Sequence, residues 1–269
     1  MKKKAILFSV FLIFIFAIGL MAMNSNKNEN LTISTATEAL SNKKISWGIK
    51  RNQNHEQPDL GANNKKLIDE NEDIAMGNNE DKYVYLTFDN GYEAGYTGQI
   101  LDILKQNNVK AAFFITGHYL NSQPDLVERM INEGHIVGNH TVNHYSLPDL
   151  SDEELEKEIQ TLHTAVYEKF NYEMKYLRPP KGEFSQRTLK LTKSLGYTTV
   201  MWSFAYDDWD ENKQGREEYA KEKILSNIHN GCVILLHVNS KDNCNILNDI
   251  IGQIKNMGYE FKTLDEFKR

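Results

Sequence analysis

The chain has little cysteine. Only two cysteines occur in 269 residues, Cys232 in an apolar run and Cys244 in a polar one. So few thiols exclude a disulfide-rich scaffold, and 40% hydrophobic residues are enough for one large domain plus an N-terminal appendage. The two thiols could pair, but a single pair in a chain of this length is more often two free thiols, which we expect here.

An excess of positive charge is also missing. The formal net charge is -6, the isoelectric point is near 5.8, and the lysines are scattered without forming a basic stripe. Domains that bind nucleic acid normally carry such a stripe. The composition therefore argues against nucleic acid, or any polyanion held by bulk charge, as the partner.

No glycine-rich phosphate loop follows the first expected strand of the main domain. Residues 90–95 read Asn-Gly-Tyr-Glu-Ala-Gly, which lacks the glycine spacing of the dinucleotide fingerprint. The sequence at this turn therefore argues against a dinucleotide-binding fold.

The first residues indicate export. Three lysines at 2–4 precede an almost unbroken apolar run over 5–23, as in a signal peptide. The run approaches the roughly 20 residues that span a bilayer, and no clean small-residue cleavage site follows it. Residues 1–23 are therefore either a removed signal peptide or an N-terminal membrane anchor, and the positive-inside rule places the rest outside the cytoplasm.

Beyond residue 23 the composition divides the chain into three parts. Residues 24–43 are rich in Asn, Ser, Thr and Lys and have few large apolar side chains, which predicts a flexible linker. Residues 44–82 mix apolar residues with many Asn and charged residues, which predicts an irregular arm packed on the following domain. Residues 83–269 are expected to form the functional domain.

The functional domain shows roughly seven β-α units in a row. The expected strands are short apolar runs, which predicts a parallel sheet covered by helices. The pattern alone does not separate an open sheet from a closed barrel. Because polar motifs follow at least five different strands, as on the C-terminal face of a barrel, we predict a barrel-like α/β fold. The expected strands are 83–89, 109–115, 136–137, 175–177, 198–202, 232–236 and 260–264, and the expected helices are 96–106, 124–133, 151–170, 186–195, 216–229 and 243–257.

Two histidines and an oxygen suggest a metal site. His140 and His144 are four residues apart, so both imidazoles would share one face if residues 141–144 form a helical turn. Asp89 or Asn90, at the end of the strand 83–89, could supply the oxygen ligand. Two nitrogens and one oxygen leave open coordination positions, which is typical of a catalytic metal. Ordinary surface or capping histidines are the alternative.

An arginine and a third histidine also follow apolar strands. Arg178 precedes two prolines, so its guanidinium projects from a rigid stretch and suits holding a carboxylate. A surface ion pair is the alternative. His237 ends a very apolar strand and becomes a candidate general acid if a carboxylate such as Asp208 orients it. A satisfied core histidine is the usual case.

Together these residues resemble the five ordered motifs of the NodB-type polysaccharide deacetylases, carbohydrate esterase family 4. The resemblance covers about residue 84 to the C-terminus, and five motifs in order are far more specific than any one. It extends upstream, at 46–48 and 54–58, to the PdaA-like branch, the delta-lactam-biosynthetic peptidoglycan deacetylases of spore formers. The motifs lie at 87–91 (Thr-Phe-Asp-Asn-Gly), 140–144 (His-Thr-Val-Asn-His), 178–182 (Arg-Pro-Pro-Lys-Gly), 202–209 and 235–237 (Leu-Leu-His).

The resemblance implies a distorted (β/α)7 barrel that hydrolyses an N-acetyl group on an amino sugar. Asp89 would be the general base and His237 the general acid. Arg178 would position Asp89, and Asp208 would tune His237.

The resemblance also implies a divalent metal, expected to be Zn²⁺. Asn90, His140 and His144 would hold it, and a backbone N–H near Lys181 would help to stabilise the oxyanion. Most of the family has an aspartate where Asn90 stands, and a neutral amide oxygen should bind the ion more weakly. Because the PdaA-like branch shares Asn90, we interpret it as a subfamily trait. The residues that would line the pocket for the acetyl methyl group are Trp209 and Leu235.

Three hypotheses about function follow. The first is a monomeric, exported de-N-acetylase of N-acetylmuramic acid in the peptidoglycan glycan strand, on the route to muramic delta-lactam of the spore cortex. Its location would be the membrane, the cell wall or the forespore intermembrane space. The second is an N-acetylglucosamine or chitin-type deacetylase. The third is a wall-glycan binding module without catalysis, which the intact acid, base and arginine argue against.

Overall fold

Residues 40–269 are described by the computed structural model. The segment 1–23, predicted to be a signal peptide or anchor, and residues 24–39 of the predicted linker lie outside the described residues. Within 40–269 no helix is both long and apolar enough to cross a bilayer. The last linker residues are not free of the domain, since the backbone N–H of Ser41 donates to the Gln186 side chain and its carbonyl accepts from Arg187.

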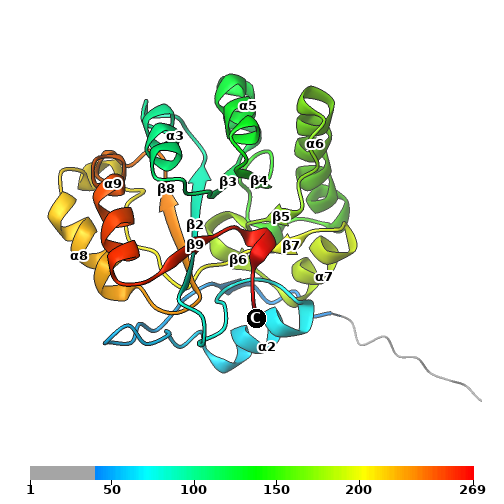
Figure 1. The fold of residues 1–269 in the computed structure, drawn as a ribbon. Helices are drawn as coiled ribbons and strands as arrows, with labels where there is room; N and C mark the ends of the chain where they lie inside the picture. Colours follow the sequence, from blue (N-terminus) through cyan, green and yellow to red (C-terminus); the bar gives the residue numbers. More distant parts are fainter. Residues whose placement is uncertain (1–39) are drawn as a thin grey trace, which may run out of the picture. The chain divides into compact units, whose positions relative to one another are not determined.

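A seven-stranded parallel sheet forms the centre of the fold (Figure 1). The chain after its edge strand returns to the opposite side of the sheet, where Phe204 forms a parallel bridge with Ile234. This bridge brings the two edges together, so the predicted barrel-like α/β fold is confirmed. In order across the sheet the strands are β7 (Thr198–Thr199), β5 (Tyr176–Leu177), β4 (Ile136–Asn139), β3 (Ala112–Ile115), β2 (Tyr83–Asn90) and β8 (Cys232–His237), and β9 (Glu260–Lys262) pairs with the start of β2.

Helices cover the outside of the sheet between successive strands, as Figure 1 shows for α3, α5 and α6. Their bounds lie within a few residues of the expected ones, and a capping box of Ser151 and Glu154 stabilises the start of α6. The short helix α4 was not expected. The helices of this layer are α3 (Thr97–Gln106), α4 (Gly117–Ser122), α5 (Pro124–Asn132), α6 (Asp152–Phe170), α7 (Gln186–Ser194), α8 (Glu217–Asn227) and α9 (Lys241–Asn256).

Alternation along β2 separates two cores. Leu86 and Phe88 belong to the cluster between the sheet and the helices, whereas Tyr85 packs inside the barrel with Phe114 and Val233. Successive side chains of a strand point to opposite faces, so Asp89 lies on the inner side. The apolar pattern that predicted the strand therefore also aims the carboxylate.

The N-terminal arm is more ordered than predicted. Its strand β1 (Ile45–Ser46) pairs antiparallel with β6 (Glu183–Phe184), and residues 62–71 form the helix α2 (Ala62–Asn71). Figure 1 places α2 beside the C-terminus, at the end of the barrel from which β2 and β8 point away. Few residues of α2 are apolar, so its sequence carries no helical pattern. The helix is stabilised by the tertiary contacts of Leu67 and Ile68. The prediction of an irregular arm was wrong for this stretch.

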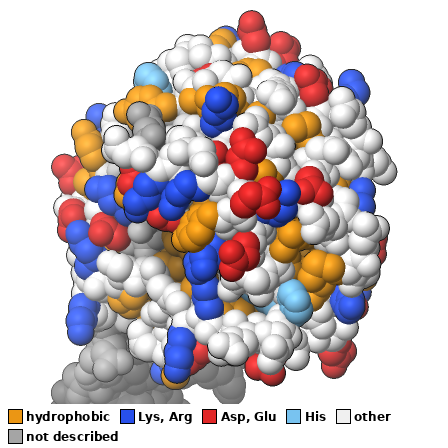
Figure 2. All heavy atoms as spheres, turned by 90° about the vertical axis from the view of Figure 1, so that its left-hand side faces the viewer, with side chains coloured by type: hydrophobic (Ala, Val, Ile, Leu, Met, Phe, Trp, Pro, Cys, Tyr) orange, Lys and Arg blue, Asp and Glu red, His pale blue; other side chains and the backbone are white. Residues whose placement is uncertain are grey.

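The thiols and the surface charges agree with the composition. Cys232 and Cys244 are free and buried. The face that carries α8 and α9 shows Lys, Arg, Asp and Glu interspersed, without a stripe of one sign (Figure 2).

A glycine is required inside the barrel next to Phe114. A Cβ atom on Gly138 would lie 2.5 Å from the Phe114 ring, and the Arg178 guanidinium lies 4.2 Å from the centroid of the same ring. The Phe114 ring therefore packs against both β4 and the Arg178 side chain.

We expect Gly138→Ala to lower the free energy of unfolding by about 1–3 kcal/mol, because the added methyl overpacks the barrel interior. Gly98→Ala is the control, since no atom lies within 4 Å of a Cβ there and the residue is inside α3, where alanine adds up to about 1 kcal/mol. Denaturant unfolding of both variants measures the difference. Equal stability of the two variants would contradict the packing argument.

Candidate active site

The predicted site residues meet at the C-terminal ends of neighbouring strands. Asp89 is near the end of β2, His140 follows β4, Arg178 follows β5 and His237 ends β8. The strands are parallel and in register, with Asp89 paired to His237 across β2 and β8. One edge of the sheet therefore collects groups that are far apart in the sequence.

A buried ion pair joins Asp89 to Arg178. The Nη1 of Arg178 donates to Oδ1 of Asp89 at 2.8 Å, and Arg178 has no exposed surface. The remaining guanidinium donors bind Thr87 Oγ1 and the carbonyls of Val200 and Met201. Burial tends to raise the pKa of Asp89, but the charge of Arg178 and the nearby histidines bring it below its usual range. Asp89 is therefore held ionised.

His140 presents one nitrogen to the site. Its Nδ1 lies 2.8 Å from the carbonyl oxygen of Arg178, and because a carbonyl only accepts, Nδ1 carries the proton. The lone pair is then on Nε2, 3.4 Å from Oδ2 of Asp89. Burial lowers the pKa of His140, so the ring is neutral and able to bind a cation.

His144 reaches His140 without a helical turn. The helical turn over 141–144 that would have placed both imidazoles on one face is not present, because Thr141 and His144 have positive φ values of 66° and 60°. Side chains fix this backbone: the Asn139 amide oxygen accepts from the N–H of Thr141, and Glu158 accepts from Asn143. The two imidazole centroids are 4.8 Å apart, and burial together with His140 lowers the pKa of His144 to about 4. Spacing suggested the right pair for the wrong conformation.

His237 forms a second charged pair with Asp208. The Nδ1 of His237 lies 2.8 Å from Oδ1 of Asp208, and Oδ2 accepts from the His237 backbone N–H and from Asn243. Burial lowers the pKa of His237, but the charge and hydrogen bond of Asp208 and the charge of Asp89 outweigh it and leave the pKa raised. The site thus holds an ionised carboxylate opposite a histidine whose pKa is raised.

The other predicted residues lie around this centre. Lys181 has φ of 60° and lies close enough to His144 to influence its pKa. Leu235 is buried beside Thr87, with 4% of its surface exposed. Trp209 follows Asp208 directly but is 59% exposed, so a lining role for its ring remains a prediction.

Asn90 is buried, and no described residue forms a hydrogen bond with either polar atom of its side-chain amide. It pairs with Ile115 in the sheet, and its side chain is near enough to the Tyr119 hydroxyl to influence the pKa of that group. A buried amide without a partner at the end of the same strand as Asp89 has the oxygen chemistry of a divalent-ion ligand, although no group of three His, Cys, Asp or Glu side chains within 40–269 has ligand geometry. Asn90 is thus the candidate third ligand.

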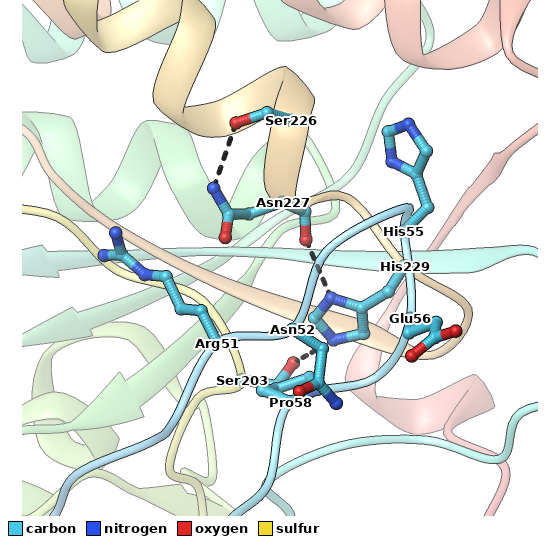
Figure 3. A pocket seen from close by; sticks show the side chains of 9 residues that line it. All are labelled: Arg51, Asn52, His55, Glu56, Pro58, Ser203, Ser226, Asn227 and His229. Atoms are coloured by element: carbon cyan, nitrogen blue, oxygen red, sulfur yellow. Dashed lines mark hydrogen bonds between the residues drawn. The ribbon is translucent and has the colours of Figure 1, made fainter.

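A small cavity in the described part of the chain lies elsewhere (Figure 3). His229 lines it, with Nδ1 bonded to the carbonyl of Asn227 and Nε2 to the Ser203 hydroxyl. His229 precedes β8, whereas His237 ends it, so the cavity is at the opposite end of that strand. None of the predicted site residues lines it.

Several supporting residues were not found from the sequence. Thr87 and Asn243 bind the two charged pairs, and Asn139 and Glu158 hold the loop between the two histidines. Two of the four stood in patterns that could have marked them: Thr87 is the first residue of the motif 87–91, and Asn139 precedes His140 at a strand end. Asn243 and Glu158 lie on helices with no signal beyond their type.

The pKa of His237 should depend on Asp208. We expect NMR titration to place it above the ordinary 6.5 in the wild type and to move it down in Asp208→Asn. A raised pKa adds stability that is present below pH 6.5 and lost as the pH rises through the folded-state value. The stability difference between the two proteins should therefore shrink with rising pH.

His135 serves as the internal reference for this titration. Burial lowers its pKa to about 4, and no contact joins it to Asp208. A shift of His135 together with His237 would point to a general structural change and contradict the local pairing.

Comparisons with known proteins agree with the motifs. The family model for polysaccharide deacetylase matches residues 76–200. Peptidoglycan-N-acetylmuramic acid deacetylase PdaA of Bacillus subtilis is 44% identical over 230 residues, covering 85% of this chain and 88% of that protein. A peptidoglycan-N-acetylglucosamine deacetylase of Bacillus cereus is 36% identical over 71% of this chain and 90% of its own length.

A solved structure shows the same relationship. The structure of Bacillus subtilis PdaA, a family 4 carbohydrate esterase, matches with a TM-score of 0.83 and 43% identity, covering 85% of this chain and 98% of that one. The resemblance inferred from the motifs is confirmed. The chain belongs to the polysaccharide deacetylases of carbohydrate esterase family 4.

Proposed function

We propose that this protein removes the N-acetyl group from N-acetylmuramic acid residues of peptidoglycan. The observation that carries the proposal is the pair of opposed charges at neighbouring positions of β2 and β8. Arg178 holds the pKa of Asp89 below its usual range, and Asp208 raises the pKa of His237 against the effect of burial. A separated base and acid are what hydrolysis of an amide needs.

Asp89 acts as the base in this proposal. Its Oδ1 is occupied by Arg178, which leaves Oδ2 to accept the proton of an attacking water. Arg178 prevents rotation of the carboxylate and keeps it ionised at neutral pH. Removing the arginine would leave the Asp89 charge buried without its partner, which typically lowers the free energy of unfolding by about 3–5 kcal/mol.

His237 acts as the acid. Its Nδ1 is committed to Asp208, so the proton on Nε2 is the one available to the leaving amine. The backbone N–H near Lys181 would donate to the oxyanion as it develops on the acetyl carbonyl, a contribution of about 2.7–4 kcal/mol for one donor.

His140, His144 and Asn90 would hold a divalent metal ion, with Zn²⁺ the expected ion. When bound, such an ion supplies Lewis-acid chemistry that polarises the acetyl carbonyl and activates water. The Arg178 carbonyl fixes the His140 tautomer that leaves Nε2 free for this role.

The choice of muramic acid rests on similarity. The relative PdaA carries the name of an N-acetylmuramic acid deacetylase, and it matches more of this chain, at higher identity, than the N-acetylglucosamine deacetylase does. We further propose that the N-terminal segment directs export of the protein, and that the reaction lies on the route to muramic delta-lactam of the spore cortex. Deacetylation frees the amine that can attack the lactyl carboxyl of the same sugar. Deacetylation of N-acetylglucosamine is the second candidate, because that relative shares the family.

The test incubates the full chain with peptidoglycan strands whose stem peptides have been removed, with and without added divalent metal. We expect released acetate, and mass spectrometry should show the loss of one acetyl group from muramic acid. Asp89→Asn and His237→Ala should lower the rate at least about 100-fold, the usual share of an acid or base. Loss from glucosamine instead would favour the second candidate, and no release from any glycan would favour a binding module.

A separate prediction concerns the metal. Asn90→Asp should bind Zn²⁺ at least about tenfold tighter in a direct titration, because a charged oxygen replaces a neutral one. Asn132→Asp, an exposed position at the end of α5, adds the same charge away from the site and should leave the affinity unchanged. Equal affinity of wild type and Asn90→Asp would remove Asn90 from the ligand set.

A further inference from the structure

The start of α9 is bound to the loop that carries Asp208. Ser240 caps the helix, and Asn243 in its first turn donates its backbone N–H to the Ser240 hydroxyl. Gln214 joins the two segments, since its side-chain oxygen accepts from the N–H of Lys241 and its amide nitrogen donates to the carbonyl of Asp208. The loop that supplies Asp208 is therefore fixed against the first turn of α9.

The side chain of Asn243 contacts acceptors on one side and a donor on the other. Its Nδ2 donates to Oδ2 of Asp208 at 2.6 Å and to the carbonyl of His237 at 3.2 Å. A carboxylate and a carbonyl only accept, so the atom that faces them is the amide nitrogen. Oδ1 of Asn243 then faces Tyr206, whose hydroxyl donates to it. Both side chains are buried, so a relay of hydrogen bonds runs from Tyr206 through Asn243 to Asp208.

These contacts fix the orientation of the Asp208 carboxylate. Oδ2 accepts from Asn243 and from the backbone N–H of His237, and Oδ1 faces the His237 ring at 2.8 Å from Nδ1. Of the two donors to Oδ2, only Asn243 is a side chain. Because Oδ2 is held at two points, Oδ1 sets the direction of the Nδ1–H bond and with it the position of Nε2 on the other side of the ring.

We propose that Asn243, oriented by Tyr206, is a positioning residue for the general acid His237. The inference rests on the proposed function, in which Nε2 of His237 gives its proton to the leaving amine. Asn243 acts through Asp208 and not on the substrate, and it keeps the His237 ring at the angle of that proton transfer. An amide suits the position, because it offers a donor to the carboxylate and an acceptor to the hydroxyl at the same time.

The test separates protonation of the leaving group from the rest of the reaction. Hydrolysis of the glycan amide releases an amine, which must be protonated as the bond breaks, whereas p-nitrophenyl acetate releases a stabilised phenolate that leaves without a proton. The readout is the ratio of kcat for the peptidoglycan strand to kcat for the ester, measured on the full chain. A general loss of folded enzyme does not change this ratio.

We expect Asn243→Ala to lower the ratio about tenfold or more, with KM for the strand nearly unchanged. Acid catalysis contributes about 10²–10⁴-fold to a rate, and misplacement of the acid removes part of that contribution. Tyr206→Phe removes one hydroxyl and keeps the ring, so it tests the relay even if Asn243→Ala folds poorly. Its ratio should fall at least about twofold, from the loss of one hydrogen bond between neutral groups.

Each variant has a matched control. Asn245→Ala removes another amide of α9 that donates to a carboxylate, but from the exposed side of the helix. Tyr85→Phe removes another buried tyrosine hydroxyl, whose partner is a backbone N–H near the C-terminus. Both controls should keep the wild-type ratio.

A second readout needs no turnover. NMR with isotope-labelled histidine follows the Nδ1 proton of His237 at a fixed pH, and the loss of the signal in His237→Ala identifies it. A proton held against the Asp208 carboxylate should exchange slowly with water. We expect Asn243→Ala to speed this exchange about tenfold, because the carboxylate loses a donor that fixes it, and Asn245→Ala to leave it unchanged.

The outcomes separate this inference from the proposed function. If the exchange rate is unchanged in both Asn243→Ala and Tyr206→Phe, the positioning role is wrong, and the proposed function stands as long as the wild type releases acetate from muramic acid. If the wild type cleaves the strand but not the ester, the exchange rate decides in place of the ratio. If the wild type releases no acetate from any strand, the proposed function fails, and faster exchange in Asn243→Ala would show only that Asn243 holds the pair of Asp208 and His237.

Discussion

The buried ion pair of Asp89 and Arg178 is the interaction on which the site depends. Arg178 has no exposed surface, and its guanidinium binds groups from β2 and from the chain that follows β7. Its own carbonyl fixes the tautomer of His140. A buried guanidinium is stable only when it is paired and hydrogen-bonded. Arg178 meets this need through Asp89, whose carboxylate it keeps ionised, while its backbone carbonyl orients the His140 ring. The Phe114 ring, which packs against Gly138, contacts the Arg178 guanidinium.

Strained backbone surrounds that pair. Thr141, His144 and Lys181 all adopt the left-handed conformation although none is a glycine. Such residues persist only where neighbouring contacts hold them, and here Asn139 and the packing around the 180–182 turn do so. The strain places an imidazole and a lysine at the rim of the barrel, at angles that a regular helix or strand would not allow.

Much of the fold was accessible from local patterns. Apolar runs that alternate with amphipathic segments gave the right elements in the right order, because burial on both faces of a parallel sheet leaves a strong signature. Most of the site residues directly follow such runs, so the meeting of Asp89, His140, Arg178 and His237 follows from parallel strands alone. The helix α2 was not predicted, because its stability comes from two side chains that pack against residues far away in the sequence.

The sequence by itself determined the parallel α/β architecture, the five ordered motifs and the chemical types gathered at one edge, because these depend on residue type and spacing along the chain. Tertiary structure alone decided the rest. It showed that Thr141 and His144 adopt the left-handed conformation in the loop after β4, and that Asn243 donates to the Asp208 carboxylate that pairs with His237. Such features depend on contacts between residues far apart in the chain. The energies of these contacts exceed local conformational preferences, and the contacts leave no periodic pattern in the sequence.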